Sequence, residues 1–330
     1  MNFCVDEPIS GSTMNLLLTS AYGTHPYLDT LRALAARSPG VRHSLCESAD
    51  DADAILFVEN VHFDDLRWKR LLRDPRLVRH REKSFIYNEA DRPWDVLPGL
   101  YCSLTRPLFS PDRHVPFVYL GMPNGHVEEV AARDDERRWL FSFTGAMSHP
   151  CRRAILGLEH PEALLRDTSG FDVWHAGASE HESRAREFAD ALAASRFVLC
   201  PRGIGSASLR LFETMRAGRA PVIVSDDWLA PPHVDWSFAL RVPERRIGSI
   251  PELLAAHADE AFERGRDARS AWELAYGESE LIDTIGDSIA HLLRGGRGKC
   301  RHPFRSNATK WLVSGEFVAR EAVRWMRRAA

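Results

Sequence analysis

The residues best suited to chemistry lie together in the middle of the second half of the chain. An apolar run at residues 196–200 has the composition of a buried strand, and Pro201 ends it because proline cannot continue a central strand. Glycines and serines occupy much of 202–208, and residues 209–217 then carry apolar side chains at helical spacing. The start of a helix offers free N–H groups and a partial positive charge. The sequence therefore predicts a strand, a glycine loop and a helix that bind an anion.

Charged side chains on this loop and helix narrow the choice of anion. Arg202 lies on the loop, and Arg210 and Glu213 are three residues apart, so both project from one helical face. A guanidinium binds phosphate through two parallel hydrogen bonds, whereas a carboxylate suits ribose hydroxyls better than a diphosphate. The pattern predicts a nucleotide diphosphate site; the alternative is a surface ion pair beside a plain turn. The predicted donor-nucleotide residues here are Arg202, Gly203, Gly205, Ser206, Ser208, Arg210 and Glu213.

Residues 200–226 read CPRGIGSASLRLFETMRAGRAPVIVSD, and Asp235-Trp236 follow. This pattern resembles the C-terminal half of the exostosin-like glycosyltransferase family, and residues 136–156 are similar to the segment where that family's nucleotide-binding domain begins. The resemblance covers residues 137–252 well. It implies an α/β protein of two Rossmann-like domains facing a cleft, the glycosyltransferase B type fold. It also implies metal-independent binding of a nucleotide sugar by the C-terminal domain and transfer with inversion at the anomeric carbon.

Further donor contacts are expected near the predicted strand at residues 139–144. Gly145 follows this strand where the backbone could approach a diphosphate closely. Arg152 lies in the first turn of the next helix, where a cation is unfavourable unless an anion offsets it. We therefore add Gly145 and Arg152 to the donor site, and we consider Trp174 and His175 for contact with the nucleotide base.

The composition is that of a globular protein without a nucleic-acid partner. Its 330 residues suffice for two domains. Acidic residues number 46 against 43 basic ones, which leaves a net charge of −3 and no general basic field. The six cysteines are widely spaced, with no CxxC pair and no zinc-site spacing, as free thiols in a reducing compartment would be. No stretch is apolar enough for a signal peptide or a membrane span. The resemblance implies a membrane anchor for eukaryotic exostosin-like enzymes, so this chain departs from them, and we expect a soluble, bacterial, cytoplasmic protein.

Strands alternate with helices along the chain, which indicates parallel sheets flanked by helices. Strands are predicted at residues 15–20, 52–59, 84–88, 99–103, 115–120, 139–144, 171–175, 196–200, 220–225 and 238–242. Helices are predicted at residues 26–37, 64–73, 152–158, 183–194, 209–217, 250–264, 268–276 and 280–293. We expect an acceptor-side domain over 1–130, a nucleotide-sugar domain over 131–295 and a tail over 296–330.

Inverting transfer needs a base that deprotonates the acceptor hydroxyl as it attacks the sugar. Carboxylates just past first-domain strands are candidates, because parallel sheets bind ligands at the carboxyl ends of their strands. We favour Asp91 and then Glu89, both after the predicted strand at 84–88; Glu59 and His25 are alternatives at other strand ends. The competing interpretation is that Asp91 only orders the turn before proline.

A metal-dependent mechanism is the main alternative to this chemistry. Asp51 and Asp53 form a DxD sequence, which in other glycosyltransferases holds a divalent cation on the diphosphate. Here DxD precedes a predicted strand, so we interpret it as a solvated turn and expect no metal and no cofactor other than the donor substrate.

The last predicted helix, residues 314–328, has an apolar face beside several arginines. Such a helix can lie on the anionic inner face of a membrane, where lipid-linked acceptors are found, or it can pack on its own protein. We expect a cytoplasmic protein with peripheral contact at the membrane through this helix.

These observations predict an inverting, metal-independent glycosyltransferase that moves a sugar from a nucleoside diphosphate, UDP as the first choice, to a polysaccharide or lipid-linked glycan. A non-catalytic nucleotide-sugar-binding subunit of a glycan-assembly complex is the alternative, because such a protein keeps the donor site and loses the base.

Overall fold

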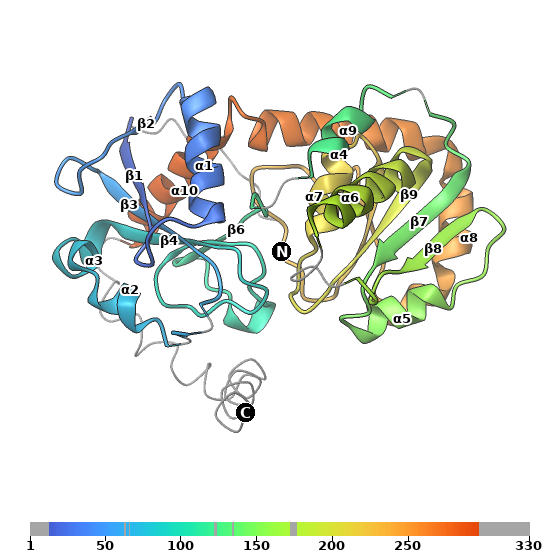
Figure 1. Ribbon diagram of the computed structural model, residues 1–330, viewed down its shortest axis with the longest axis horizontal. Coiled ribbons are helices and arrows are strands. Elements are labelled where there is room, and N and C mark those ends of the chain that lie inside the picture. Colours follow the sequence, from blue (N-terminus) through green and yellow to red (C-terminus); the bar gives the residue numbers. More distant parts are fainter. Residues whose placement is uncertain are drawn as a thin grey trace. The chain divides into compact units, whose positions relative to one another are not determined.

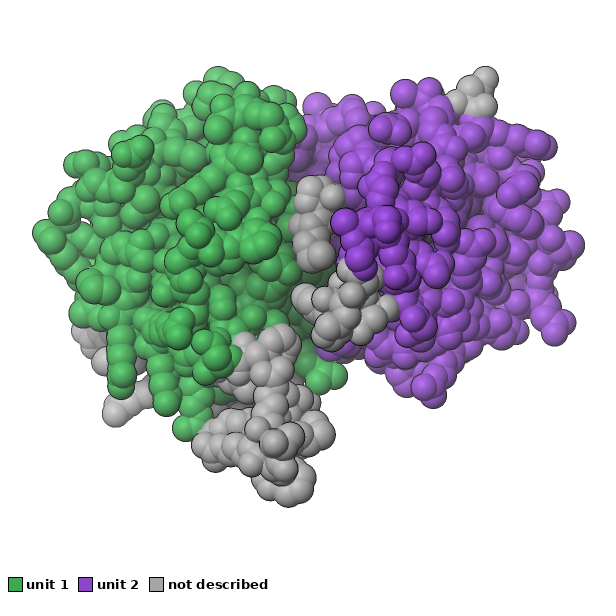
Figure 2. Space-filling model, in the orientation of Figure 1, with its two compact units in different colours: residues 1–122, 278–330 green, residues 123–277 purple. Residues whose placement is uncertain are grey.

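The computed structural model describes residues 13–62, 64–65, 67–121, 124–133, 135–171 and 177–296. They divide into two compact units, coloured separately in Figure 2: unit 1 takes the residues up to 122 and from 278 onward, and unit 2 takes 123–277. Each unit is built on its own parallel β-sheet with flanking helices (Figure 1). The prediction of two Rossmann-like α/β domains is confirmed.

Unit 1 contains a six-stranded parallel sheet in the order β2-β1-β3-β4-β5-β6. Its central strands β3 and β4 are buried along their whole length, which explains their nearly continuous apolar sequences. The strands are β1 (Asn15–Thr19), β2 (Ser44–Leu45), β3 (Ala54–Glu59), β4 (Ser84–Asn88), β5 (Gly99–Tyr101) and β6 (His114–Pro116).

Helix α1 (Pro26–Arg37) has the bounds that its sequence predicts. Proline occupies its first position, and His25 caps it by accepting a hydrogen bond from the backbone of Leu28. The predicted helix at 64–73 begins only at α2 (Lys69–Arg73), because Trp68 has a positive φ of 57° that a helix cannot include. The other helices of unit 1 are α3 (Pro75–Arg79) and α10 (Leu281–Gly296).

Helix α10 belongs to unit 1, although the sequence groups it with the second domain. The carboxylate of Asp283 accepts hydrogen bonds from the backbone N–H groups of Val41, Arg42 and His43 at 3.0, 3.0 and 2.9 Å. The helix also contacts β5 and β6. The structure therefore differs from the predicted domain bounds of 1–130 and 131–295, since contacts between distant segments determine where α10 packs.

Unit 2 contains a five-stranded parallel sheet in the order β11-β10-β9-β7-β8. Edge strand β8 was not predicted, because it is only half-buried and lacks a clear apolar run. The strand predicted at 171–175 lies, apart from its first residue, outside the described residues. The strands are β7 (Trp139–Gly145), β8 (Ala163–Asp167), β9 (Ser195–Pro201), β10 (Ala220–Val224) and β11 (Leu240–Arg241).

The helices of unit 2 are α4 (Gly125–Val130), α5 (Pro150–Leu156), α6 (Ala178–Ala193), α7 (Leu209–Arg216), α8 (Ile250–Ala256) and α9 (Ala261–Tyr276), and the 3₁₀ helix η3 spans Glu244–Ser249. The hydrophobic core of unit 2 includes sheet residues Phe141, Phe143, Phe197 and Leu199. Arg219 is also buried there, and its guanidinium donates to the carbonyls of Leu192, Ala193 and Ala217, which joins the ends of α6 and α7. No helix in the described part of the chain is both long and apolar enough to cross a membrane.

Candidate functional site

The predicted unit of strand, loop and helix is present in unit 2. Strand β9 ends at Pro201, the glycine loop covers residues 202–208, and α7 begins at Leu209. Ser208 is the N-cap of α7, yet its side chain makes no capping hydrogen bond. Gly218, with φ of +64°, ends the helix, and β10 then pairs with β9 in parallel. Leu211 donates its backbone N–H to the carbonyl oxygen of Ser208 at 3.0 Å, and no Ser208 side-chain cap competes with an anion at the start of α7.

Arg152 holds the glycine loop in place. Its guanidinium donates to the carbonyl of Arg202 at 2.8 Å, to that of Ala146 at 2.9 Å and to that of Pro201 at 3.4 Å. A Cβ atom on Gly203 would lie 2.8 Å from Nη2 of Arg152, so a side chain at this position would displace the guanidinium. The structure thus gives Arg152 a role in positioning the loop, next to the predicted phosphate site.

Arg210 of α7 reaches back to the end of β7. Its guanidinium donates to the carbonyl oxygen of Thr144 and lies 4.8 Å from the ring centroid of Phe143. A Cβ atom on Gly145 would come within 2.5 Å of Nη2 of Arg210. The absence of a side chain at Gly145 therefore makes room for an arginine, where the sequence suggested room for a diphosphate. Burial lowers the pKa of Arg210, and its guanidinium keeps its charge at neutral pH.

Three buried polar atoms around the loop have no hydrogen-bond partner among the described residues: Oγ1 of Thr144, Nε of Arg202 and Nε of Arg210. Leaving such a group unsatisfied costs about 1–3 kcal/mol. The two nitrogen atoms are donors on cationic side chains. These atoms are suited to a ligand that brings acceptor oxygens.

Glu213 is the most unusual of the predicted site residues. Its side chain lies on α7 with 9% exposure, and its carboxylate makes no hydrogen bond or ion pair with any described residue. Burial raises the pKa of this carboxyl group, while Arg210 and Arg216 act to lower it. No ion pair within the described chain joins Arg210 to Glu213, so the alternative of an ordinary surface pair does not apply. Hydroxyl donors from a ligand would satisfy this carboxylate.

Arg202 is paired with carboxylates in this structure. Its Nη1 lies 3.0 Å from Asp227 and 3.8 Å from Glu244, and its side chain is 15% exposed. The other predicted donor residues of the loop are buried. They are Gly203, Gly205, Ser208 and Ser206, whose carbonyl accepts a hydrogen bond from Ser225 at 2.7 Å. The predicted donor residues are thus brought together at the carboxyl ends of β7 and β9.

The two predicted catalytic carboxylates have opposite surroundings in unit 1. Glu89 is buried and accepts hydrogen bonds from the hydroxyl of Tyr87 and from the backbone N–H groups of Leu120 (2.7 Å) and Gly121 (2.8 Å). Burial raises its pKa, and these hydrogen bonds counteract the rise. Asp91 is exposed, just past β4, and accepts a hydrogen bond from Tyr119 at 3.2 Å. Asp91 is therefore exposed to solvent, whereas Glu89 holds the backbone of residues 120–121 at the end of β4.

A histidine that sequence reasoning passed over lies at the end of β3. The fully buried carboxylate of Glu59 accepts hydrogen bonds from Ser20 and Ala21, and Nε2 of His62 lies 2.9 Å from it. The His62 ring stacks on Tyr22, with centroids 3.5 Å apart. Its Nδ1 makes no hydrogen bond to a described residue. A carboxylate that orients one imidazole nitrogen leaves the other for proton transfer. The sequence feature that could have pointed to His62 is its position three residues after Glu59, at the end of a predicted strand.

His25 is the other alternative base, and both of its ring nitrogens contact backbone groups. Its Nδ1 caps α1, and its Nε2 lies 3.0 Å from the carbonyl oxygen of Val58. The DxD aspartates lie before the first residue of β3, at the end opposite Glu59. Asp53 accepts a hydrogen bond from the backbone of Asn15, the first residue of β1, at 2.8 Å. Trp174, His175 and the predicted helix at 314–328 lie outside the described residues.

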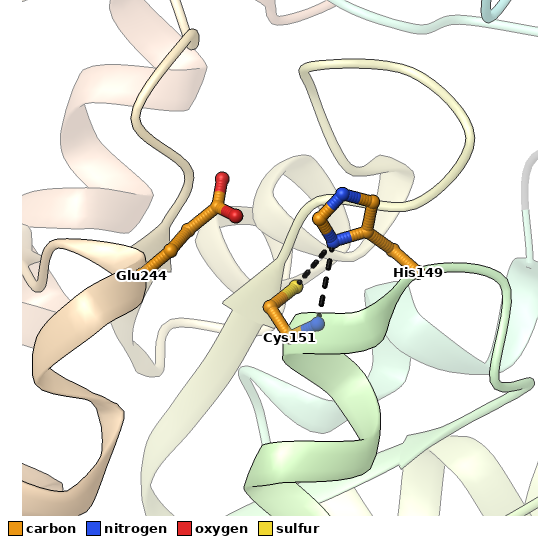
Figure 3. Close-up of side chains that lie close together, drawn as sticks. All are labelled: His149, Cys151 and Glu244. Carbon is orange, nitrogen blue, oxygen red and sulfur yellow. Dashed lines mark hydrogen bonds between the residues drawn. The ribbon is translucent and has the colours of Figure 1, made fainter.

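One other polar cluster lies beside the glycine loop. His149, the N-cap of α5, directs Nδ1 toward the sulfur of Cys151 at 3.1 Å, and the carboxylate of Glu244 faces both (Figure 3). Burial and the charges of Arg202 and Arg152 lower the pKa of His149. Burial raises the pKa of the Cys151 thiol to about 11.

Part of the chain is similar in sequence to known exostosin proteins. Residues 105–257 match the Exostosin GT47 domain. The chain is 36% identical to the Exostosin-1 homolog of Caenorhabditis elegans over 132 residues, which are 39% of this chain and 31% of that protein. It is 32% identical to Exostosin-1 of Drosophila melanogaster over 92 residues, or 27% of this chain and 12% of that protein. The chain thus spans a third or less of the length of these relatives.

Among solved structures, MurG of Acinetobacter baumannii aligns with a TM-score of 0.34 and 12% identity, covering 84% of this chain and 99% of that one. The matched GT47 segment includes β7, β9, the glycine loop, α7 and η3, and so contains every predicted donor-nucleotide residue. Through this segment the chain is similar to the exostosin-like glycosyltransferases.

Proposed function

We propose that the chain transfers a sugar from a nucleoside diphosphate donor to a glycan acceptor, with inversion at the anomeric carbon and without a metal ion on the diphosphate. The buried, unpartnered carboxylate of Glu213 is the observation that carries this proposal. It lies one helical turn beyond Arg210, whose Nε also has no hydrogen-bond partner among the described residues. A nucleoside diphosphate satisfies both, because its ribose hydroxyls donate to the carboxylate and its phosphate oxygens accept from the guanidinium.

In this proposal the start of α7, with Arg202 and Arg210, stabilises the charge that builds on the leaving diphosphate. Arg202 exchanges Asp227 for phosphate when the donor binds. Asp91 accepts the proton of the acceptor hydroxyl, since it is the exposed member of the predicted pair. UDP is the nucleotide we choose, and a polysaccharide or lipid-linked glycan is the acceptor class. We keep a cytoplasmic location at the membrane face as part of the proposal.

Glu213→Gln should weaken UDP binding about tenfold to a hundredfold, because a hydrogen bond to a charged group is worth about 1.5–3 kcal/mol. The same variant should be at least as stable as the wild type, because a neutral amide is easier to bury than an unpartnered carboxylate. Calorimetric titration with UDP, uridine and pyrophosphate measures the first effect, and thermal unfolding measures the second. Only the two ligands that contain ribose should lose affinity.

Glu263→Gln is the matched control, since that glutamate is 71% exposed and pairs with Arg266 at the surface. Equal UDP affinity in wild type and Glu213→Gln would remove the nucleotide site from the proposal. A wild type that binds UDP and never transfers sugar from a labelled donor would instead be a non-catalytic nucleotide-sugar-binding subunit.

Chelation with EDTA should leave the rate of transfer unchanged, because arginines and the start of α7 take the place of a cation on the diphosphate. Initial rates with and without EDTA test this, with added Mg²⁺ and Mn²⁺ as the controls. A rate that falls on chelation and returns with either ion would support a metal on the diphosphate and would redirect attention to Asp51 and Asp53.

A further inference from the structure

We propose that His149, Cys151 and Glu244 bind one divalent transition-metal ion of the zinc type, at a site that takes no part in sugar transfer. Each residue offers one ligand atom, and these atoms all lie within 4.8 Å of one another. Figure 3 shows the imidazole and the sulfur facing the Glu244 carboxylate across a shared space. Ligand atoms of a tetrahedral zinc site are about 3.6 Å apart, from bond lengths of about 2.0–2.3 Å. Small side-chain shifts therefore suffice to bring the three atoms onto one ion.

The chemistry of the ligand set selects the ion. A cysteine sulfur is a soft donor and an imidazole is intermediate, so this set suits Zn²⁺ or Co²⁺, whereas Mg²⁺ and Ca²⁺ prefer oxygen ligands. On binding, the thiol releases its proton to solvent and the sulfur–metal bond forms. Three protein ligands leave a fourth position for water. In the described part of the chain this is the one group of three such side chains close enough to share an ion.

The ion would replace the 3.1 Å contact between Nδ1 of His149 and the sulfur of Cys151, together with two weak hydrogen bonds from the backbone. Nδ1 of His149 accepts a hydrogen bond from the backbone of Cys151 at 3.3 Å, and Glu244 accepts one from the backbone of Asp226 at 3.2 Å. Both are longer than the usual 2.9–3.0 Å. Arg202 lies 3.8 Å from Glu244 but only 3.0 Å from Asp227. Asp227 therefore offsets this guanidinium, and the carboxylate of Glu244 is left for the ion.

The ion would join two segments that are distant in sequence, the start of α5 and the start of η3. Cys151 also lies against the glycine loop, with its sulfur 3.8 Å from the carbonyl oxygen of Arg202. Metal bound to the folded state alone raises the stability of that state. We therefore expect zinc to raise the melting temperature of the protein.

The test is titration of the metal-free, full-length protein with Co²⁺, in the absence of nucleotide. We expect a near-ultraviolet charge-transfer band from a Co²⁺–thiolate bond that saturates at one equivalent and disappears when Zn²⁺ is added. Cys151→Ser should lose the band and the zinc-dependent rise in melting temperature. Glu244→Gln should keep the band and weaken Co²⁺ binding at least about tenfold. Cys46→Ser, which removes a half-buried thiol elsewhere, should behave like the wild type.

A folded wild type without the thiolate band would overturn the proposal. So would a band that persists in folded Cys151→Ser, since the ion would then sit on another thiol. Should Cys151→Ser fail to fold, unchanged Co²⁺ affinity in Glu244→Gln would equally exclude this site. None of these measurements involves nucleotide or turnover, so they can fail while the proposed transfer activity stands.

Discussion

Replacing Asp91 with asparagine should lower kcat by about 10²–10⁴-fold and leave the dissociation constant of the donor close to the wild-type value. The expected loss is large because the amide cannot take up the proton of the attacking hydroxyl. Donor binding should persist because the predicted nucleotide residues lie on other elements, β7 to α7 of unit 2. Single-turnover rates and donor titrations measure the two quantities separately.

Asp50→Asn is the control, because Asp50 is an exposed carboxylate of the same unit that pairs with Arg79 and His80. It should retain wild-type turnover. Full activity in Asp91→Asn would exclude Asp91, and His62→Gln would then test the imidazole that Glu59 orients. Glu89 is less suited to act as the catalytic base than its place after β4 suggests, because its carboxylate already accepts three hydrogen bonds. A product with retained configuration would contradict the inverting mechanism itself.

The second large effect concerns Arg210. Arg210→Lys should lower kcat by about 10²–10³-fold, the size expected when one donor to a developing negative charge is lost. Lysine keeps the charge, but it lacks the planar fork that donates to Thr144 and still leaves Nε for a phosphate oxygen. Steady-state kinetics give kcat and KM, and thermal unfolding checks that the fold survives.

Arg216→Lys is the matched control on the same helix. Its guanidinium pairs with Glu128 at 2.5 Å, on the last turn of α7. This control should change neither kcat nor donor affinity appreciably. Equal kcat in Arg210→Lys and the wild type would leave Arg210 with a packing role over Phe143 and would move the stabilisation of the diphosphate to Arg202 and the helix start.

Local sequence determined the elements that build the nucleotide site. The apolar run before Pro201 became β9, the next apolar run became β10, and Gly218 ended the helix between them. Helix α1 likewise has its predicted bounds, because the proline and the capping histidine at its start act within one turn. Such signals can be read from the sequence because the residues that decide them are neighbours in the chain.

Tertiary structure decided which side chains have partners. Glu89 and Asp91 look equivalent in sequence, yet the backbone of Leu120 and Gly121 returns to Glu89 and saturates it. Gly145 and Gly203 look like phosphate-binding glycines, yet a side chain at either position would meet an arginine from another helix. Likewise, only folding buries Glu213 where no described residue forms a hydrogen bond or ion pair with its carboxylate.

Sequence alone therefore determined the α/β class, the two-domain plan and the strand, loop and helix of the donor site, because hydrophobic period and turn residues act over short distances. Only the tertiary structure assigned α10 to unit 1 and brought Glu244 to His149 and Cys151. Those outcomes depend on packing between segments far apart in the chain. Helical or strand periodicity constrains which face of an element is buried, and it carries no information about the element that covers that face.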